Sequence, residues 1–222
     1  MVAGFAQSAP NAVLLRFAER ERRRLRGRAY VLDVGCGAAR NAIPLIHLGW
    51  DVIGVDLSWP MLGAAAQRAH QERIGDRLHL ILAAMDQIPA RRQSVDLVIA
   101  HGIWNLARST AEFRQAVREA ARVAKPDAGL FVFTFSRNTL RAEATPVQGE
   151  PFVFTQFSGQ PQCFLTESQL IDELDAAGFA RDPDIPLTEY NRPRPGTLQA
   201  GAVPMIYEAA FRRRPRRAED QA

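Results

Sequence analysis

Short apolar runs alternate along the chain with longer amphipathic stretches. An apolar run of five to seven residues bounded by turn residues is typical of a buried strand, and a 3.6-residue apolar period is typical of a helix. Strands are predicted at 30–34, 52–56, 78–82, 95–100 and 129–135, and helices at about 11–24, 42–48, 59–74, 110–125 and 167–177. Strands that alternate with helices favour an α/β fold with a doubly wound parallel sheet.

The remaining segments complete one predicted domain over residues 1–222, because 222 residues with 47% hydrophobic content suffice for one core. A leading helix segment covers 10–28 and a strand–helix core covers 29–135. Proline and glycine interrupt 136–165, which predicts an insertion near a substrate mouth, with a short strand at about 152–157. A helix and two edge strands, at about 179–190 and 203–211, fill 166–211, and 212–222 is predicted to be a basic flexible tail.

One glycine turn carries most of the chemical information. The run YVLDVGCGAAR, residues 30–40, places a strand with Asp33 before a glycine turn that opens a helix. The next strand ends in Asp56, about 20 residues further on, where a parallel sheet presents an acid to a ribose. Together the turn and the two acids predict a nucleoside cofactor.

The residue at position 40 separates two kinds of nucleoside site. A dinucleotide fold favours G-x-G-x-x-G, whose last glycine lets the helix pack closely, but that position is Arg40. The pair Gly35 and Gly37 followed by Ala38 and Ala39 instead resembles motif I of the class I S-adenosylmethionine-dependent methyltransferases. The resemblance covers about residues 29–135 and departs from the G-x-G-x-G form at Ala39. The run 36–45 looks most like the small-molecule branch that includes tellurite-resistance-type methyltransferases.

This resemblance implies a Rossmann-like, doubly wound sheet of seven strands, mostly parallel, with an antiparallel C-terminal edge and helices on both faces. It implies metal-independent, in-line transfer of a methyl group from S-adenosylmethionine to a small soluble acceptor. Asp33, Gly35 and Gly37 would surround the methionine part, Asp56 the ribose hydroxyls and Asp86 the adenine. The expected cofactor set is completed by Cys36, Leu57, Met85 and His101.

The segment after the fourth strand, residues 101–106, should face the reactive methyl group, because open sheets bind ligands beyond the carboxyl ends of their strands. His101 is the candidate general base, and the alternative is a hydrogen-bonded structural histidine under the cofactor. Trp104 and Asn105 are candidates for a wall and a polar anchor of the acceptor site, and Arg137, Tyr190 and Arg192 could reach it from later loops. Simple packing or surface exposure is the alternative for each.

Charge and the remaining composition bound the partners. The net charge is +4, and arginines cluster at 20–28 and 212–217. These clusters could contact an RNA backbone, which makes an RNA methyltransferase one alternative, but acids accompany both clusters and no aromatic residues interleave to stack bases, so solvated surface is favoured. A non-catalytic S-adenosylmethionine-binding protein is the other alternative.

Several features are absent from the sequence. The four histidines and two cysteines show no metal-ligand or disulfide spacing. No apolar run approaches the roughly 20 residues that cross a bilayer, and the first residues lack the order of a signal peptide. We therefore expect a cytoplasmic protein without a metal or membrane partner, and the sequence favours no oligomeric state.

Overall fold

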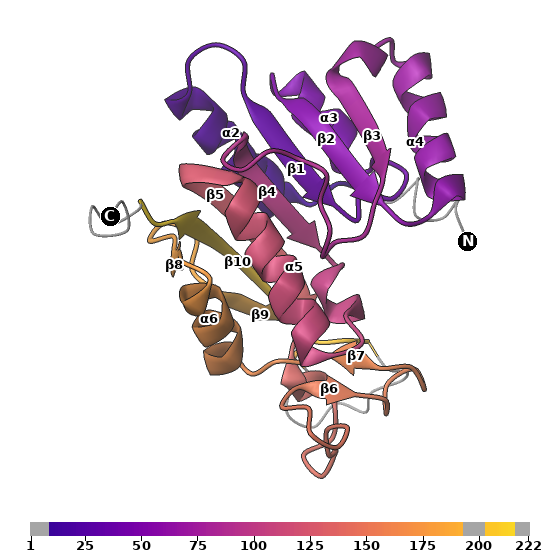
Figure 1. Cartoon of the computed structure of the whole chain (residues 1–222), viewed down its shortest axis with the longest axis vertical. Helices are drawn as coiled ribbons and strands as arrows, with labels where there is room; N and C mark the ends of the chain where they lie inside the picture. The colour runs from indigo at the N-terminus through magenta and orange to yellow at the C-terminus, as the bar shows by residue number, and fades with distance from the viewer. Residues whose placement is uncertain (1–8, 193–202, 216–222) are drawn as a thin grey trace.

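The computed structural model describes residues 9–192 and 203–215. Its main sheet has eight strands in the order β3-β2-β1-β4-β5-β10-β8, with β9 also paired to β10 (Figure 1). The first five strands are parallel to one another, β10 is antiparallel to β5, and β8 and β9 are antiparallel to β10. The bounds are β1 Tyr30–Val34, β2 Asp51–Asp56, β3 Leu78–Leu82, β4 Val95–His101, β5 Ala124–Phe135, β8 Phe179–Arg181, β9 Thr188–Tyr190 and β10 Ile206–Arg213.

The predicted α/β class and the mostly parallel, doubly wound sheet are confirmed, but the predicted count of seven strands is wrong. The stretch 179–190 was expected to be one interrupted strand, and it forms both β8 and β9. Pro183 and Pro186 lie between them, and proline cannot donate to a strand ladder. The two short strands therefore pair with different ends of β10.

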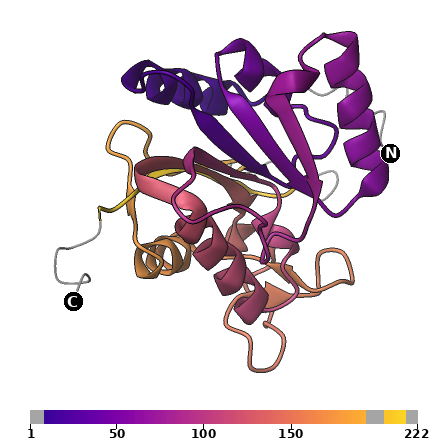
Figure 2. The same ribbon diagram turned by 45° about the horizontal axis from the view of Figure 1, so that its top comes forward.

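Helices cover both faces of the sheet and enclose a core on each (Figures 1 and 2). Apolar residues of α2, α3 and α4 pack on one face, and those of α5 and α6 pack on the opposite face. The bounds are α2 Ala12–Arg24, α3 Ala42–His47, α4 Trp59–Gln71, α5 Thr110–Val123 and α6 Glu167–Ala176.

Side-chain caps begin four of these helices. Asn11, Ser58, Ser109 and Thr166 each accept a hydrogen bond from the backbone N–H three residues further on. The sequence T-x-x-Q at Thr166 forms a complete capping box. The similar sequence S-x-x-E at Ser109 forms only half of one, because the carboxylate at position 112 accepts from the N–H at position 108 instead, at 2.7 Å.

The insertion contains a two-stranded antiparallel hairpin, β6 Val153–Phe154 with β7 Gln162–Cys163, in place of the single strand expected at about 152–157. Aromatic rings hold it against the end of β5: Phe164 stacks on Phe135 with centroids 5.2 Å apart and meets Phe154 edge-on at 6.1 Å. The hairpin also contacts the turn 104–106.

One arginine from each of the two clusters contacts the same pair of buried acids. Arg20 and Arg212 both contact the buried carboxylates of Glu21 and Asp182, at distances between 2.6 and 3.1 Å. Arg24 adds a further contact to Glu21 at 2.7 Å. Arg212 lies within β10, so the flexible tail predicted from 212 begins too early, and the part of that tail after 215 lies outside the described residues. Arg20 and Arg212 are therefore ion-paired, whereas Arg23, Arg24, Arg26 and Arg28 of the first cluster are exposed, as expected of solvated surface.

Candidate functional site

The direction in which the strands are added to the sheet reverses between β1 and β4. From β1 the chain proceeds outward to β2 and β3, then returns to β4 and proceeds the other way to β5. Ligands of open α/β sheets bind beyond the carboxyl ends of the strands at such a switch. The glycine turn follows β1 and the segment 101–106 follows β4, so the two segments flank this point.

The glycine turn has a strained, tightly packed backbone. Gly35, Gly37 and Ala39 have φ angles of 69°, 52° and 61°, in the left-handed region that glycine adopts most readily. A Cβ on Gly35 would lie 2.7 Å from Ile103 Cδ1, so only glycine fits there. Ala39, where the sequence departs from G-x-G-x-G, therefore adopts the left-handed conformation although it carries a side chain.

Asp56 fixes the turn to the end of β2. Its Oδ2 accepts from Gly37 N at 2.9 Å and its Oδ1 accepts from Ser58 N at 2.8 Å. The backbone of the turn is also tied to β2, because Gly35 N and Cys36 N both donate to Val55 O, at 2.8 and 3.1 Å. Cys36 is buried, and burial raises the pKa of its thiol well above the ordinary range, which makes it an inert thiol.

Three further residues of the expected cofactor set lie at neighbouring strand ends. Leu57 directly follows β2 and is 71% exposed, an unusual exposure for a leucine. Met85 and Asp86 are half-buried in the turn that follows β3. Since β3 pairs with β2, with Leu82 beside Asp56, these residues lie along one edge with Asp56.

Asp33 is a buried acid without a full set of partners. It is 2% exposed, and its Oδ2 has no hydrogen-bond partner among the described residues. Burial raises the pKa of Asp33 to about 7, with Arg40 opposing and Asp56 adding to the rise. Arg40 is half-buried, and its Nη2 lies 3.2 Å from His101 Nδ1.

His101 is held as a neutral ring. It stacks on Phe133 with centroids 4.1 Å apart, and its Nε2 lies 3.4 Å from Asn11 Nδ2. Burial, followed by the positive charge of Arg40, lowers the pKa of His101 to about 4. Both ring nitrogens face N–H donors, and a neutral imidazole has only one acceptor nitrogen. This geometry favours the hydrogen-bonded structural histidine over the general base.

Sequence reasoning missed two residues next to His101. Asn11 Nδ2 donates to Glu208 Oε2 at 2.6 Å, and Tyr190 donates through its hydroxyl to Glu208 Oε1 at 2.9 Å. In the sheet, Phe133 of β5 lies between its two pairing partners, His101 of β4 on one side and Glu208 of β10 on the other. Glu208 is 4% exposed. An acid inside the otherwise apolar run 205–211 was the available signal. His101, Asn11, Glu208 and Tyr190 thus form a polar row, linked by the contacts above. Among the expected acceptor residues, Tyr190 is the one that this row connects to His101.

Trp104 does not form a wall of an open site. It is fully buried and meets Phe113 edge-on at 6.1 Å, because the short 3-10 turn at Trp104–Leu106 folds its indole into the core beside α5. Asn105 is 2% exposed, and its Oδ1 has no partner among the described residues.

The two arginines expected at the acceptor mouth have structural partners instead. Arg137 donates to the backbone carbonyls at 140, 141, 142 and 144 and lies over the Phe154 ring at 4.9 Å, so it fixes the insertion. Arg192 forms a surface ion pair with Glu189. The structure does not bring either guanidinium to His101.

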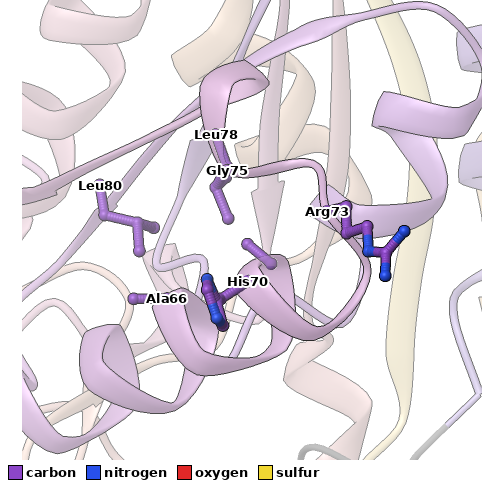
Figure 3. Close-up of a pocket in the computed structure, with 7 residues that line it drawn as sticks. Ala66, His70, Arg73, Gly75, Leu78 and Leu80 are labelled. Carbon is purple, nitrogen blue, oxygen red and sulfur yellow. The ribbon is translucent and has the colours of Figure 1, made fainter.

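A separate hollow of about 400 Å³ lies between α4 and β3. Figure 3 shows Leu78, Leu80 and His70 around it, with Arg73 extending to one side. Its lining comes from the second half of α4, the turn that follows this helix and the start of β3, away from the strand ends that hold Asp33 and Asp56. We therefore assign the site by the residues at the switch point and not by this hollow.

Among residues 9–192 and 203–215, no group of three histidine, cysteine or acidic side chains could hold a metal ion.

In the same ranges, no helix combines the length and apolar character that crossing a bilayer requires.

Comparisons with known proteins find methyltransferases. Residues 31–127 match the family model described as a methyltransferase domain. A demethylmenaquinone methyltransferase of Lactiplantibacillus plantarum is 36% identical over 110 residues, which are 48% of this chain and 45% of the relative. A ubiquinone biosynthesis O-methyltransferase of Azorhizobium caulinodans is 26% identical over 153 residues, 67% of this chain and 58% of the relative. The chain thus spans about half the length of these relatives.

Solved structures share the fold. A S-adenosylmethionine-dependent methyltransferase of Methanosarcina mazei has a TM-score of 0.71 at 16% identity and covers 93% of this chain and 99% of its own. The 1,6-didemethyltoxoflavin-N1-methyltransferase of Burkholderia thailandensis, solved with S-adenosylhomocysteine, has a TM-score of 0.66 at 19% identity and covers 90% and 78%. The predicted resemblance to the methyltransferases is confirmed over residues 31–127, and the fold over most of the chain. The tellurite-resistance branch is not confirmed.

Proposed function

We propose that this chain, whose residues 31–127 match the model of a methyltransferase domain, is a class I enzyme that transfers a methyl group from S-adenosylmethionine to a small-molecule acceptor. One observation carries the proposal: the glycine turn, pinned by Asp56 and lying next to the buried Asp33, stands at the switch point of the sheet. An acid beside such a turn is what a nucleoside cofactor requires.

Each part of the cofactor has a proposed contact. The methionine part lies against Asp33, Gly35, Cys36 and Gly37. The ribose hydroxyls donate to Asp56, whose two oxygens already accept one backbone N–H each and can each accept another bond.

At the other end of the cofactor, the adenine lies beside Asp86 with Leu57 and Met85 as apolar neighbours. The exposure of Leu57 supports this placement, because an adenine ring would cover it.

The cofactor supplies a methyl group on a positively charged sulfur. This chain's residues then need to hold the acceptor atom in line with that methyl group, and alignment of this kind contributes up to roughly 7–11 kcal/mol. His101, with its pKa near 4 and both ring nitrogens facing donors, is a weak base. The acceptor is therefore one whose nucleophilic atom needs little help to lose a proton.

Activated aromatic compounds meet that requirement. The two relatives are named for quinone biosynthesis, and this suggests a small aromatic or quinol-like acceptor for this chain as well. The polar row of His101, Asn11, Glu208 and Tyr190 lies at the carboxyl end of the sheet, where such an acceptor would meet the methyl group. The ion-paired arginines at Arg20 and Arg212 give no support to an RNA acceptor.

The test is transfer of a radiolabelled methyl group to a panel of phenols, quinols, thiols, heterocyclic amines and chalcogen oxyanions. Labelling of one acceptor class supports the proposal if Asp56→Ala abolishes it. The matched control is Asp76→Ala, a change at an exposed aspartate, which should retain the labelling. Cofactor binding without transfer to any class or to a cell extract would favour the non-catalytic binding protein.

A further inference from the structure

The loop between β3 and β4, residues 83–94, carries Asp86 and contains no helix or strand. Among residues 9–192 and 203–215, the half-buried side chain of Asp86 has no hydrogen-bond or ion-pair partner. The direction of its carboxylate is therefore set by the backbone of the loop and not by a contact of its own.

Two anchors fix that backbone on either side of Asp86. The first is β2, because Ala83 N donates to the carbonyl of the last residue of this strand at 3.1 Å. The second is α5, because Ile88 N donates to Glu119 Oε2 at 3.0 Å and Ile88 O accepts from Arg122 Nη2 at 2.7 Å. Asp86 lies in the turn between these anchors, which a hydrogen bond of 3.2 Å from the N–H at 87 to the carbonyl at 84 closes.

Glu119 and Arg122 form a paired unit at the second anchor. They lie one helical turn apart, and Nε and Nη2 of Arg122 donate to the two carboxylate oxygens of Glu119 at 2.7 and 2.8 Å. A two-point pair of this kind fixes the geometry of both groups. The hydrogen bond from Arg122 holds the pKa of Glu119 below its ordinary value, so the acid stays ionised at neutral pH.

The pair fixes more of the loop than the position of Ile88. Arg122 Nη1 also donates to the carbonyl at position 90 at 2.8 Å, so the pair binds peptide groups at two places in the loop. The Ile88 side chain is 4% exposed and packs in the core, which by itself keeps the loop near α5. What the pair adds is the orientation of the peptide groups that follow Asp86.

We propose that Glu119 and Arg122 are positioning residues for the adenine, which act through the loop and touch no part of the cofactor. They hold the Ile88 end of the loop so that the Asp86 carboxylate accepts a hydrogen bond from the exocyclic amino group of the base. The inference rests on the proposed function and adds a determinant of base specificity to it. An ionised carboxylate only accepts hydrogen bonds, so a base with an oxygen in place of the amino group would be disfavoured.

Calorimetry with S-adenosylhomocysteine and S-inosylhomocysteine, in which an oxygen replaces the amino group, tests this role. The wild type should bind the adenosyl ligand about 10- to 100-fold more tightly, because the oxygen leaves the acid without its donor. Glu119→Ala should lower this ratio of affinities at least about threefold, since Asp86 loses its direction. Glu119→Gln keeps an oxygen that accepts from Ile88 N and should retain most of the ratio.

The matched control is Arg114→Gln. This change removes another ion pair of α5, with Glu173 of α6 at 2.7 Å, and neither residue of that pair contacts the loop 83–94 through a hydrogen bond. The control should therefore keep the wild-type ratio of affinities even if it lowers the stability of the fold.

The outcomes separate this inference from the proposed function. If Glu119→Ala weakens both ligands equally, or neither, the ratio stays at the wild-type value and the pair has only a structural role, which overturns the inference. A wild-type ratio near one overturns it as well, because Asp86 then does not read the base. If the wild type binds neither ligand, the proposed function fails and the inference fails with it. Arg122→Gln, assessed by the same ratio, decides the matter if Glu119→Ala does not fold.

Discussion

Replacement of Arg212 by methionine should destabilise the fold by about 2–3 kcal/mol at neutral pH. Arg212 contacts Glu21 at 2.8 Å and Asp182 at 2.9 Å, and both carboxylates are at most 4% exposed. Loss of one partner of a buried ion pair costs roughly 3–5 kcal/mol, because it leaves an uncompensated charge. Arg20 still contacts both acids and Arg24 still contacts Glu21, so we expect the loss to fall below that range.

The penalty should depend on pH. Burial alone would raise the pKa values of Glu21 and Asp182, but the arginines hold both below their ordinary values. A depressed pKa means that the ionised acid stabilises the fold above its unfolded pKa, about 4 for both residues, and that this stability is lost as the pH falls through the folded value. The difference between the wild type and Arg212→Met should therefore narrow below about pH 4.

Urea unfolding followed by circular dichroism at pH 7 and pH 3.5 measures both effects. The control is Arg23→Met, which removes an exposed pair with Glu19 and should cost less than about 0.5 kcal/mol. A loss for Arg212→Met as small as that of the control, or a loss that stays the same at both pH values, would refute the reasoning.

Three further variants test the site itself. Asp56→Ala should weaken S-adenosylmethionine binding by about 1–3 kcal/mol in calorimetry, since it strands the donors of the turn and the ribose, and an unchanged affinity would remove Asp56 from the site. Gly35→Ala should lower the free energy of unfolding by about 2–4 kcal/mol, because the backbone there is left-handed and the new Cβ would clash with Ile103 Cδ1. Adding Ile103→Ala should relieve only the clash. Wild-type stability of Gly35→Ala would disprove the packing. With the pKa of His101 at about 4, the ring stays neutral above pH 5, so the pH profile of the methyl-transfer rate should show no ionisation near pH 6.5. An ionisation near pH 6.5 that is present in the wild type and absent in His101→Gln would support His101 as the general base.

The elements that the sequence predicted best are those whose signals are local. The strand 78–82 has its predicted bounds, and the helices predicted to begin at 59 and 167 begin there. Ser58 and Thr166 cap these two helices, and a cap bonds an N–H only three residues away. The split of 179–190 into two strands was less visible. Prolines mark where a strand breaks, but the sequence does not state which partner each half will pair with.

The residues of the site could likewise be predicted only where their contacts are close in the topology of the chain. The glycine turn and Asp56 could be predicted because one crossover brings them together, and the structure joins them by a hydrogen bond of 2.9 Å. The contact between Asn11 and Glu208 spans 197 positions and depends on the antiparallel addition of β10 to β5. The sequence could not decide between the two interpretations of Trp104 for a similar reason, because its burial depends on packing against α5, which no pattern within the turn reveals.

Calorimetric titration of the purified protein with S-adenosylmethionine and S-adenosylhomocysteine, with NADH and NADPH as controls, tests the central claim most directly. We predict micromolar binding of the first pair and none of the second, because the turn that ends in Arg40 suits a nucleoside without a pyrophosphate. Binding of NADH, or no heat with S-adenosylmethionine and its product, would contradict the assignment of this site.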